Sequence, residues 1–362
     1  MNRVLKLATA PIKLFTINPL NAAFRFLCFL LFTAFLSGCL HHRLDARYAG
    51  PKRPTGALKY SGPKVVYQEK VLEQIGDITQ KEIRFDIGDG KTQILNYFEI
   101  HATNPLPVIM ISPAMGGSYW LERRIARYFA ANGYPVVLVQ RVKVKLDPNR
   151  TPDVLELDHS LEGRIREHQR ALDWIATQPS LDPQKIGIIG ISKGAIDTTL
   201  LLAHDTRVKA AVLLLAGGNL PYVIAYTREP HLQKQRSALL EKLKMDEVAL
   251  REKLEKEMVW EPTKFADQID ARSVLMILGL CDTIVPFKCG LELRNALGKP
   301  ETYVIPTGHI SAYLMKGYIQ KKSLEFFERK FAEPNRTAQT ADVGDKESGA
   351  TGQKSIATSA AP

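Results

Sequence analysis

The sequence Gly-Ile-Ser-Lys-Gly at residues 190–194 places the strongest constraint on the fold, because it separates two segments of different character. Before it, residues 185–189 (Lys-Ile-Gly-Ile-Ile) form a short apolar run, typical of a parallel strand buried on both faces. After it, residues 195–203 are apolar and small enough to begin a packed helix. A serine between two glycines at such a sharp turn lies exposed at the helix N-terminus, whose dipole favours developing negative charge. The pattern predicts that Ser192 is a nucleophile.

This motif has only three fixed residues and can occur by chance as a tight glycine turn, so its meaning depends on the rest of the chain. A nucleophilic serine needs a histidine to accept its proton and a carboxylate to orient the histidine, here in the chain order Ser, Asp, His. Asp282 follows the apolar run 273–279, and His309 follows the alternating run 301–306. An aspartate after a strand is usually a turn former or a helix cap, yet these signals occur in the required order. We therefore predict a triad of Ser192, Asp282 and His309.

Acyl transfer also needs N–H donors that stabilise the oxyanion of a tetrahedral intermediate. One donor is expected to be the backbone N–H of Lys193, directly after the nucleophile. The second is expected in the Gly-rich loop 113–118, which follows the apolar run 107–112. We assign it to the backbone N–H of Met115, with the neighbouring Ala114 as the alternative donor.

These segments resemble the α/β-hydrolase superfamily from about residue 64 to residue 332. The resemblance rests on residues 190–194, on Gly-Leu-Cys-Asp-Thr-Ile-Val-Pro at 279–286, and on the pair Gly-His at 308–309. It implies an α/β fold with a mostly parallel, eight-stranded sheet and a serine hydrolase that uses no cofactor. Where many members have His-Gly before the oxyanion residue, this chain has Pro-Ala, which leaves the chemistry intact because the donors are backbone groups.

The order of the expected elements agrees with this fold. Residues 64–75 and 82–100 are expected to form antiparallel strands, with a hairpin turn at Gly-Asp-Gly 88–90. Strand-like and helix-like runs then alternate from residue 108 to residue 215, which predicts a parallel sheet with helices on both faces. The charge-rich segment 219–269 interrupts this alternation with one or two amphipathic helices. It is either a helical cap over Ser192 or a solvated decoration; its position after the nucleophile favours the cap.

A second strong signal lies at the N-terminus. Residues 1–38 contain four basic residues and no acidic ones, and residues 26–36 form an apolar core of the length expected for a signal peptide. The sequence Leu-Ser-Gly-Cys at 36–39 resembles the bacterial lipobox, which predicts lipidation of Cys39 and removal of residues 1–38. A plain signal peptide or an uncleaved anchor is the alternative. Because leucine rather than aspartate follows Cys39, the resemblance implies a lipid-anchored protein at the outer membrane, facing the periplasm.

The remaining cysteines, Cys281 and Cys289, are expected either to form a disulfide in this oxidising compartment or to be free thiols. Residues 39–63 are expected to be a tether between the lipid and the domain at 64–332, and residues 333–362 a disordered tail. Without residues 1–38 the formal charge falls from +11 to +7, since four basic residues are lost. The chain has no Lys/Arg cluster interleaved with aromatic residues, so nucleic acid is not an expected partner, and no metal-binding motif occurs.

The sequence therefore predicts a lipid-anchored serine hydrolase that cleaves small carboxylic esters or thioesters through an acyl-enzyme. The same triad would also serve amide hydrolysis or acyl transfer to another alcohol. A non-catalytic envelope protein that binds a ligand on the same fold is the alternative of a different class.

Overall fold

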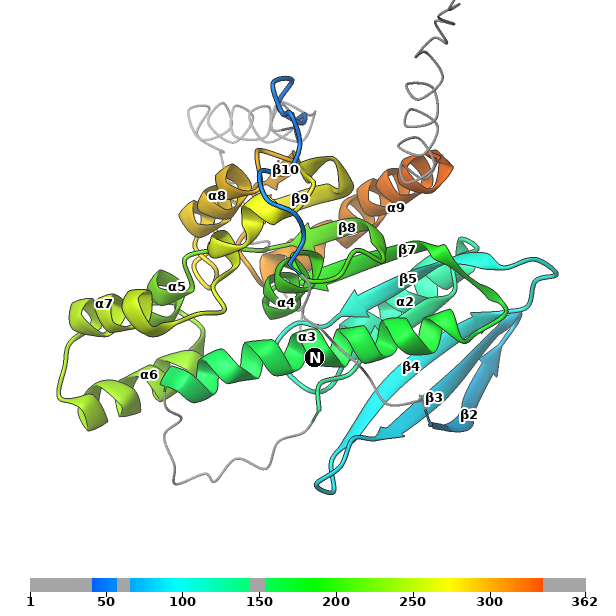
Figure 1. The fold of residues 1–362 in the computed structure, drawn as a ribbon, viewed down its shortest axis with the longest axis horizontal. Helices are drawn as coiled ribbons and strands as arrows, with labels where there is room; N and C mark the ends of the chain where they lie inside the picture. The colour runs from blue at the N-terminus through cyan, green and yellow to red at the C-terminus, as the bar shows by residue number, and fades with distance from the viewer. Residues whose placement is uncertain (1–40, 57–65, 143–153, 335–362) are drawn as a thin grey trace, which may run out of the picture. The chain divides into compact units, whose positions relative to one another are not determined.

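The computed structural model describes residues 41–56, 66–142 and 154–334, which contain one mixed β-sheet and the helices packed against it (Figure 1). The strands, in chain order, are β1 (His41–His42), β2 (Gln68–Ile75), β3 (Ile78–Asp86), β4 (Thr92–Ile100), β5 (Leu106–Ser112), β6 (Val136–Val139), β7 (Leu181–Ile191), β8 (Val208–Leu214), β9 (Val274–Gly279) and β10 (Glu301–Ile305). Their order across the sheet is β1-β10-β9-β8-β7-β5-β6-β4-β3-β2. The expected number of eight strands is wrong, because the described part of the chain has ten.

Helices lie between most of these strands. They are α2 (Trp120–Ala131), α3 (Val154–Ala176), α4 (Lys193–Leu202), α5 (Leu220–Tyr226), α6 (Pro230–Leu243), α7 (Glu247–Glu257), α8 (Phe287–Ala296) and α9 (Lys316–Ala332). Short 3-10 helices are η1 (Pro262–Lys264), η2 (Ala266–Gln268), η3 (Ala271–Ser273) and η4 (Ser311–Met315).

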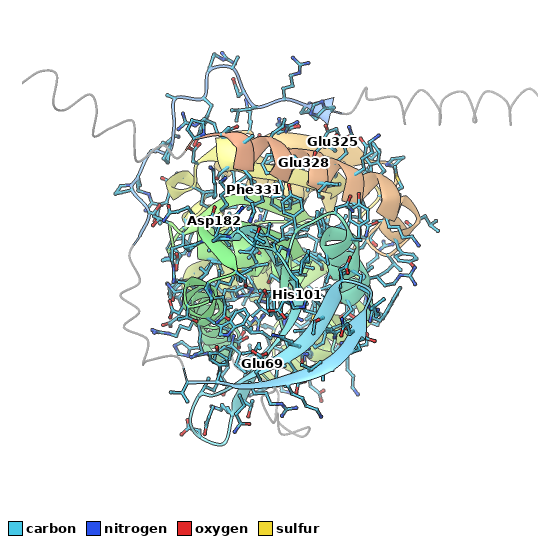
Figure 2. All side chains as sticks on the ribbon, turned by 90° about the vertical axis from the view of Figure 1, so that its right-hand side faces the viewer. Glu69, His101, Asp182, Glu325, Glu328 and Phe331 are labelled. Atoms are coloured by element: carbon cyan, nitrogen blue, oxygen red, sulfur yellow. The ribbon has the colours of Figure 1, made fainter. Side chains whose placement is uncertain are left out.

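At the antiparallel end of the sheet, β2, β3 and β4 pair in sequence. β2 falls within the expected strand 64–75, and the expected turn at residues 88–90 joins β3 to β4. β3 begins at Ile78, before the expected start at residue 82, and every residue of β2 is exposed. Glu69 on β2, which is labelled in Figure 2, forms an ion pair of 2.8 Å with Lys81 on β3 that adds to the backbone pairing.

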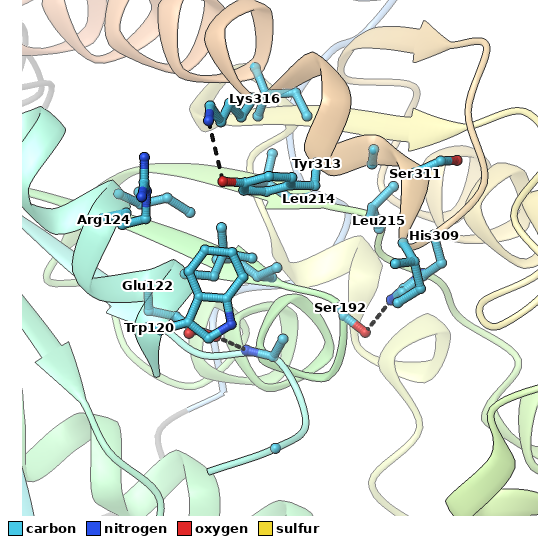
Figure 3. Close-up of a pocket in the computed structure, with 18 of the residues that line it drawn as sticks. Trp120, Glu122, Arg124, Ser192, Leu214, Leu215, His309, Ser311, Tyr313 and Lys316 are labelled. Atoms are coloured by element: carbon cyan, nitrogen blue, oxygen red, sulfur yellow. Dashed lines mark hydrogen bonds between the residues drawn. The ribbon is translucent and has the colours of Figure 1, made fainter. Parts of the chain in front are cut away.

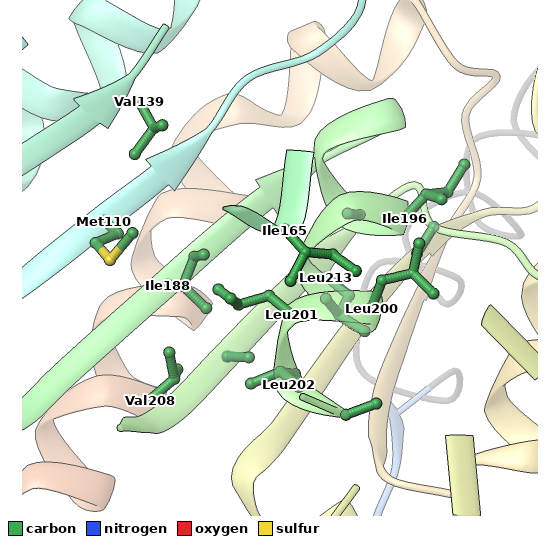
Figure 4. Packing of buried hydrophobic residues seen from close by; sticks show 14 of the residues in the cluster. Met110, Val139, Ile165, Ile188, Ile196, Leu200, Leu201, Leu202, Val208 and Leu213 are labelled. Atoms are coloured by element: carbon green, nitrogen blue, oxygen red, sulfur yellow. The ribbon is translucent and has the colours of Figure 1, made fainter. Parts of the chain in front are cut away.

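The strands from β5 to β10 run parallel to one another, as the alternation of strands and helices predicts. The outer edge of β6 pairs antiparallel with β4. Helices α3 and α4 lie on the near side of the sheet in Figure 1, and α2 and α9 on the far side. On the near side, Ile165 of α3 and Leu200 of α4 pack with strand residues such as Met110 and Ile188 (Figure 4). On the far side, α2 and α9 meet through the rings of Phe129 and Phe327, whose centroids are 6.0 Å apart. The sheet is therefore buried on both faces and holds the loops at its ends in place.

The segment 219–269 forms α5, α6 and α7, followed by η1 and η2. These helices lie beside the N-terminal half of α3 in Figure 1. The buried Asp158 of α3 accepts hydrogen bonds from the backbone N–H groups of Val259 and Trp260 at 2.8 to 3.1 Å, which attaches the segment to α3. None of its residues lines the pocket that contains Ser192. The segment does contact the loop that carries Asp282, because the hydroxyl of Thr227 donates to the carbonyl of Ile284 at 2.8 Å. Its role as a cap over Ser192 stays a prediction.

Residues 45–56, within the predicted tether, contact the domain along their length. Arg53 donates to the carboxylate of Asp267 at 2.8 and 2.9 Å, and the N–H of Gly56 donates to the carbonyl of Ala203 at 2.8 Å. The hydroxyl of Tyr48 donates to a backbone carbonyl at 3.2 Å and accepts from the backbone N–H of Ala271 at 2.9 Å. These side chains fix a segment whose Pro- and Gly-rich composition resembles a linker.

The predicted signal peptide at 1–38, the lipidation site Cys39 and residues 335–362 of the predicted tail lie outside the described residues. Within the described ranges, no helix combines the length and apolar character needed to cross a bilayer.

Candidate active site

The predicted site residues meet at the carboxyl ends of neighbouring parallel strands. Ser192 follows β7, the loop 113–118 follows β5, and β5 and β7 are adjacent. Asp282 follows β9 and His309 follows β10, which are also adjacent. Ligands of open α/β sheets bind at this edge, so strand order alone brings the four segments together.

Ser192 lies in a strained turn between β7 and α4. Its φ of 54° and ψ of −116° are unusual for a residue with a side chain, and its own N–H donates to the carbonyl of Leu214 at 2.8 Å. A Cβ atom added to Gly194 would lie 2.1 Å from the carbonyl oxygen of Ser112, and one added to Gly190 would lie 2.6 Å from Thr198. Both glycines are therefore required by the close approach of backbone and side chains around the serine.

The three residues of the predicted triad form one hydrogen-bonded chain (Figure 3). The Nε2 atom of His309 lies 2.8 Å from the hydroxyl oxygen of Ser192, and its Nδ1 atom lies 2.6 Å from Oδ2 of Asp282. With the proton on Nδ1, the imidazole donates to the carboxylate and accepts from the serine. The other carboxylate oxygen, Oδ1, accepts from the N–H groups of Ile284 and Val285 at 2.9 and 3.0 Å. The carboxylate is thus held by its own loop and directed at the histidine.

Backbone hydrogen bonds join the aspartate loop to the histidine loop. The N–H of Leu280 donates to the carbonyl of Ile305 at 2.9 Å, and the N–H of Cys281 donates to that of Thr307 at 3.0 Å. These bonds continue the pairing of β9 with β10 beyond the ends of the strands. The separation of Asp282 and His309 therefore depends on the sheet itself and not only on the side chains.

The structure distinguishes between the two expected donors in the loop after β5. The N–H of Ala114 already donates to the carboxylate of Glu122 at 3.0 Å, so this group is not available to an oxyanion. Met115 follows it, lines the pocket and is 43% exposed. Lys193 is the first residue of α4, where N–H groups have no acceptor within the helix. The N–H groups of Met115 and Lys193 are therefore the candidate oxyanion donors.

Two side chains outside the predicted set hold the loop after β5. Glu122, at the start of α2, is buried and binds the N–H of Ala114. Arg141, which follows β6, donates to the carbonyl oxygens of Ala114 and Pro113, each at 2.7 Å. The peptide groups before Met115 are thus fixed on both sides by charged side chains, which orients the next N–H group.

Asp197 of α4 is completely buried beneath the nucleophile and lies among three cations. It contacts the ammonium of Lys193, and its Oδ2 lies 3.5 Å from Arg164 and 3.9 Å from Arg141. Burial opposes ionisation of this carboxyl, yet the three cations outweigh it and hold its pKa below the usual value. Burial lowers the pKa of Lys193 to about 8 against the attraction of Asp197. One carboxylate therefore connects the residue after the nucleophile with the arginine that holds the oxyanion loop.

Arg141, Glu122 and Asp197 were not among the predicted site residues. Arg141 could have been suspected, since it comes two residues after the end of β6 at the same edge of the sheet. The other two had no such signal, because acidic residues near a helix start are common surface features. Their role depends on which side chains face them across the fold.

Of the two alternatives for Cys281 and Cys289, the structure has the free thiols. Cys281 is exposed and lines the pocket near Gly308, whereas Cys289 is buried on α8, where its Cβ closely approaches Gly217. Burial raises the pKa of the Cys289 thiol to about 12. The oxidising compartment suggested a bridge, but α8 directs the second thiol into the core.

Ser192 and His309 open into a pocket of about 1280 Å³, formed mainly by the loop after β5, α2, η4 and the start of α9. Within the described ranges, no group of three or more His, Cys, Asp or Glu side chains is arranged to hold a metal ion.

Comparisons with known proteins agree with this architecture. Residues 96–235 match the model of the dienelactone hydrolase family. Similar solved structures include acetyl xylan esterase 1 from Thermoanaerobacterium sp., with a TM-score of 0.55 and 17% identity over 72% of this chain and 88% of that one. They also include the acetyl xylan esterase from Paenibacillus sp., with a TM-score of 0.54 and 16% identity over 72% of this chain and 89% of that one. No curated protein matches the chain. Identities this low support the fold alone, and the predicted α/β-hydrolase fold is confirmed.

Proposed function

We propose that this α/β-hydrolase is a serine ester hydrolase that works through an acyl-enzyme. The hydroxyl oxygen of Ser192 attacks the ester carbonyl carbon while Nε2 of His309 accepts the hydroxyl proton. Asp282 holds the imidazole in the required tautomer and stabilises the imidazolium that forms. The carbonyl oxygen becomes an oxyanion, which accepts hydrogen bonds from the N–H groups of Lys193 and Met115.

The intermediate collapses when its bond to the alcohol oxygen breaks and His309 returns the proton to that oxygen. The acid part remains bonded to Ser192 as an acyl-enzyme. A water molecule then attacks the same carbon, with His309 again accepting a proton. The bond from the carbon to the Ser192 oxygen breaks, His309 returns the proton to that oxygen, and the acid is released. Each step needs only the groups that lie around Ser192.

The observation that carries this proposal is the hydrogen-bonded chain from Ser192 through His309 to Asp282, at 2.8 and 2.6 Å, beside the pocket. Both contacts fall in the range expected between a nucleophile, its general base and the group that orients the base. The dienelactone hydrolase match and the esterase neighbours support esters as the substrate class. Thioesters, amides and acyl transfer to another alcohol use the same groups and rank behind ester hydrolysis.

We also propose that the protein is a lipid-anchored component of the bacterial cell envelope, at the outer membrane and facing the periplasm. The support is the basic segment, apolar core and Leu-Ser-Gly-Cys sequence in residues 1–39. Mass spectrometry of the N-terminus after expression in a bacterium tests it: a diacylglyceryl group on Cys39 is expected. An unmodified Cys39 in the membrane fraction contradicts it.

Labelling with a fluorophosphonate probe and hydrolysis of p-nitrophenyl acetate test the proposed chemistry. We expect the wild-type chain to be labelled on one serine, and Ser192→Ala and His309→Ala to abolish labelling. Asp282→Asn should lower kcat by roughly 10⁴-fold, as the corresponding change does in serine proteases, because it stabilises the wrong imidazole tautomer. Asp267→Asn is the control, since that carboxylate pairs with Arg53 at the surface.

One outcome of these experiments would contradict the proposal. A folded wild-type chain that is neither labelled nor active on esters and thioesters of different sizes would overturn the proposal. It would support a binding protein that uses the fold without its chemistry.

A further inference from the structure

The pocket beside Ser192 is larger than the chemistry at its base requires. Its volume is about 1280 Å³, whereas pockets for small ligands usually measure roughly 300–1,000 Å³. An acetyl group and a small alcohol would leave most of this space to water. The size of the pocket therefore points to a substrate with a large group attached to the ester.

The walls of the pocket are mainly apolar. Leu214, Leu215 and Ile277 line it from strand ends, and Ile125 of α2 and Ile319 of α9 line it from the helices. These side chains offer no hydrogen bonds, so a polar group placed against them would lose water without gaining a partner from them. An alkyl chain gains from the same contacts.

Two of the charged residues that line the pocket already have partners. The carboxylate of Glu122 binds the N–H of Ala114, and the guanidinium of Arg127 pairs with Glu73 of β2. Arg124 and Lys316 are exposed, and Figure 3 shows their charged groups away from the Ser192–His309 pair. The apolar path from the nucleophile outward is thus not interrupted by an unpaired buried charge.

The apolar surface continues beyond the pocket onto its rim. Trp120 of α2 and Tyr313 of η4 form an edge-to-face pair with ring centroids 5.4 Å apart (Figure 3). Trp120 is 51% exposed, and Ile310 and Leu314 are 76% and 83% exposed. Large apolar side chains that gather around the mouth of a pocket on a soluble domain indicate a site that binds an apolar ligand.

We infer that the preferred substrate is an ester with a long unbranched apolar chain, bound along this pocket from Ser192 toward Trp120 and Tyr313. The inference rests on the proposed ester hydrolysis and specifies its substrate class. The chain can belong to the acid part or to the alcohol part of the ester. Both parts are attached at the reacting carbon, and an alkyl chain on either would gain from the same apolar walls.

The first experiment measures kcat/KM against chain length below the micelle concentration of each ester. One series is p-nitrophenyl esters from acetate to laurate, and the other is alkyl acetates from ethyl to dodecyl. We expect kcat/KM to rise about two- to fourfold per methylene over at least six methylenes in one series, since each buried CH₂ contributes up to about fourfold. The series that rises identifies the part of the ester that carries the chain.

The second experiment replaces two apolar side chains at the mouth of the pocket. We expect Trp120→Ala and Leu314→Ser to lower the ratio of kcat/KM for laurate and acetate, or for dodecyl and ethyl acetate, by at least about fivefold. Leu291→Ala is the matched control, because Leu291 is a 37% exposed residue of α8 that does not line the pocket. It should leave this ratio unchanged. Both rim residues are exposed, so their replacement is compatible with folding.

The outcomes separate this inference from the proposed function. A protein that reacts with fluorophosphonate and hydrolyses acetate, but shows a flat or falling dependence on chain length in both series, overturns the long-chain substrate only. The long-chain substrate is also overturned if Trp120→Ala, Leu314→Ser and the control Leu291→Ala have the same effect on the ratio of kcat/KM between long and short esters. A protein without labelling and without activity on any ester overturns the proposed function itself.

Discussion

The guanidinium of Arg141 donates a hydrogen bond of 2.7 Å to the carbonyl oxygen of Ala114, the residue directly before the candidate oxyanion donor Met115. A peptide group whose carbonyl is held in this way cannot rotate freely, so the following N–H keeps its direction. Arg141 also lies 3.9 Å from Asp197, which contacts the side chain of Lys193. Both candidate oxyanion donors are therefore connected to one buried carboxylate that does not touch the substrate pocket.

We predict that Arg141→Met lowers kcat on p-nitrophenyl acetate by about 10- to 100-fold and changes KM by less than about threefold. A lost oxyanion donor costs about 10²–10³ in rate, and a donor that is only misdirected should cost less. KM should change little because Arg141 holds the loop and does not line the pocket. Steady-state kinetics measure both quantities, and the extent of fluorophosphonate labelling shows that the protein remains folded around Ser192.

Two further variants define this role. Arg141→Lys should recover only part of kcat, because an ammonium cannot hold two carbonyl oxygens with the geometry of a guanidinium. Arg166→Met, which removes an exposed arginine paired with Glu162, should leave kcat unchanged. If kcat of Arg141→Met stays within twofold of the wild type, the loop does not depend on this arginine.

The positions of the nucleophile, the base and the acid could be predicted from the sequence because each follows a recognisable strand. Ser192, Asp282 and His309 come directly after apolar or alternating runs, and parallel strands place their carboxyl ends at one edge. Their hydrogen-bonded contacts follow from strand order and need no information on side-chain packing. Ala114 and Met115 could not be separated in this way, since the choice depends on a contact with Glu122.

Other features could not be predicted because they depend on which way an element faces. The segment 219–269 contains helices, as expected, but an apolar stripe in a sequence does not say which neighbour it packs against. Asp158 attaches that segment to α3, away from the pocket lining. The choice between a bridge and free thiols for Cys281 and Cys289 could not be made for the same reason, because it depends on Cys281 being exposed while Cys289 is buried on α8.

The strained turn around Ser192 also leads to a prediction about stability. Gly194→Ala should lower the free energy of unfolding by about 2–3 kcal/mol, because the added Cβ would lie 2.1 Å from the carbonyl oxygen of Ser112 and force the backbone apart. Urea denaturation followed by circular dichroism measures the change. The displaced turn should also slow fluorophosphonate labelling of Ser192.

Gly163→Ala is the matched control for this substitution. Gly163 lies within α3, and a Cβ added there meets no other atom within 4 Å. This change should raise the free energy of unfolding by up to about 1 kcal/mol, because alanine favours the helix and restricts the unfolded chain. A Gly194→Ala protein that unfolds at the wild-type urea concentration would show that the turn around Ser192 has room for a side chain.

His168 of α3 makes the stability of this protein sensitive to acid. It is fully buried, its Nδ1–H donates to the carbonyl oxygen of Arg164 at 2.7 Å, and its Nε2 has no hydrogen-bond partner among the described residues. Burial, together with the nearby charge of Arg164, lowers the pKa of His168 to about 3. A histidine in the unfolded chain takes up a proton near pH 6.5. Between these two pKa values the unfolded chain therefore binds one more proton than the folded protein.

The consequence is a stabilising contribution that is fully present above about pH 6.5 and lost progressively as the pH falls toward about 3. We predict that His168→Gln, whose amide N–H can still donate to the Arg164 carbonyl, reduces the fall in unfolding free energy across this window by on the order of 3 kcal/mol. Urea denaturation at several pH values measures the two slopes. Carboxylates that become protonated over the same range contribute equally to both proteins and cancel in the difference. Parallel slopes for the wild type and His168→Gln would mean that His168 takes up its proton in the folded protein as readily as in the unfolded chain.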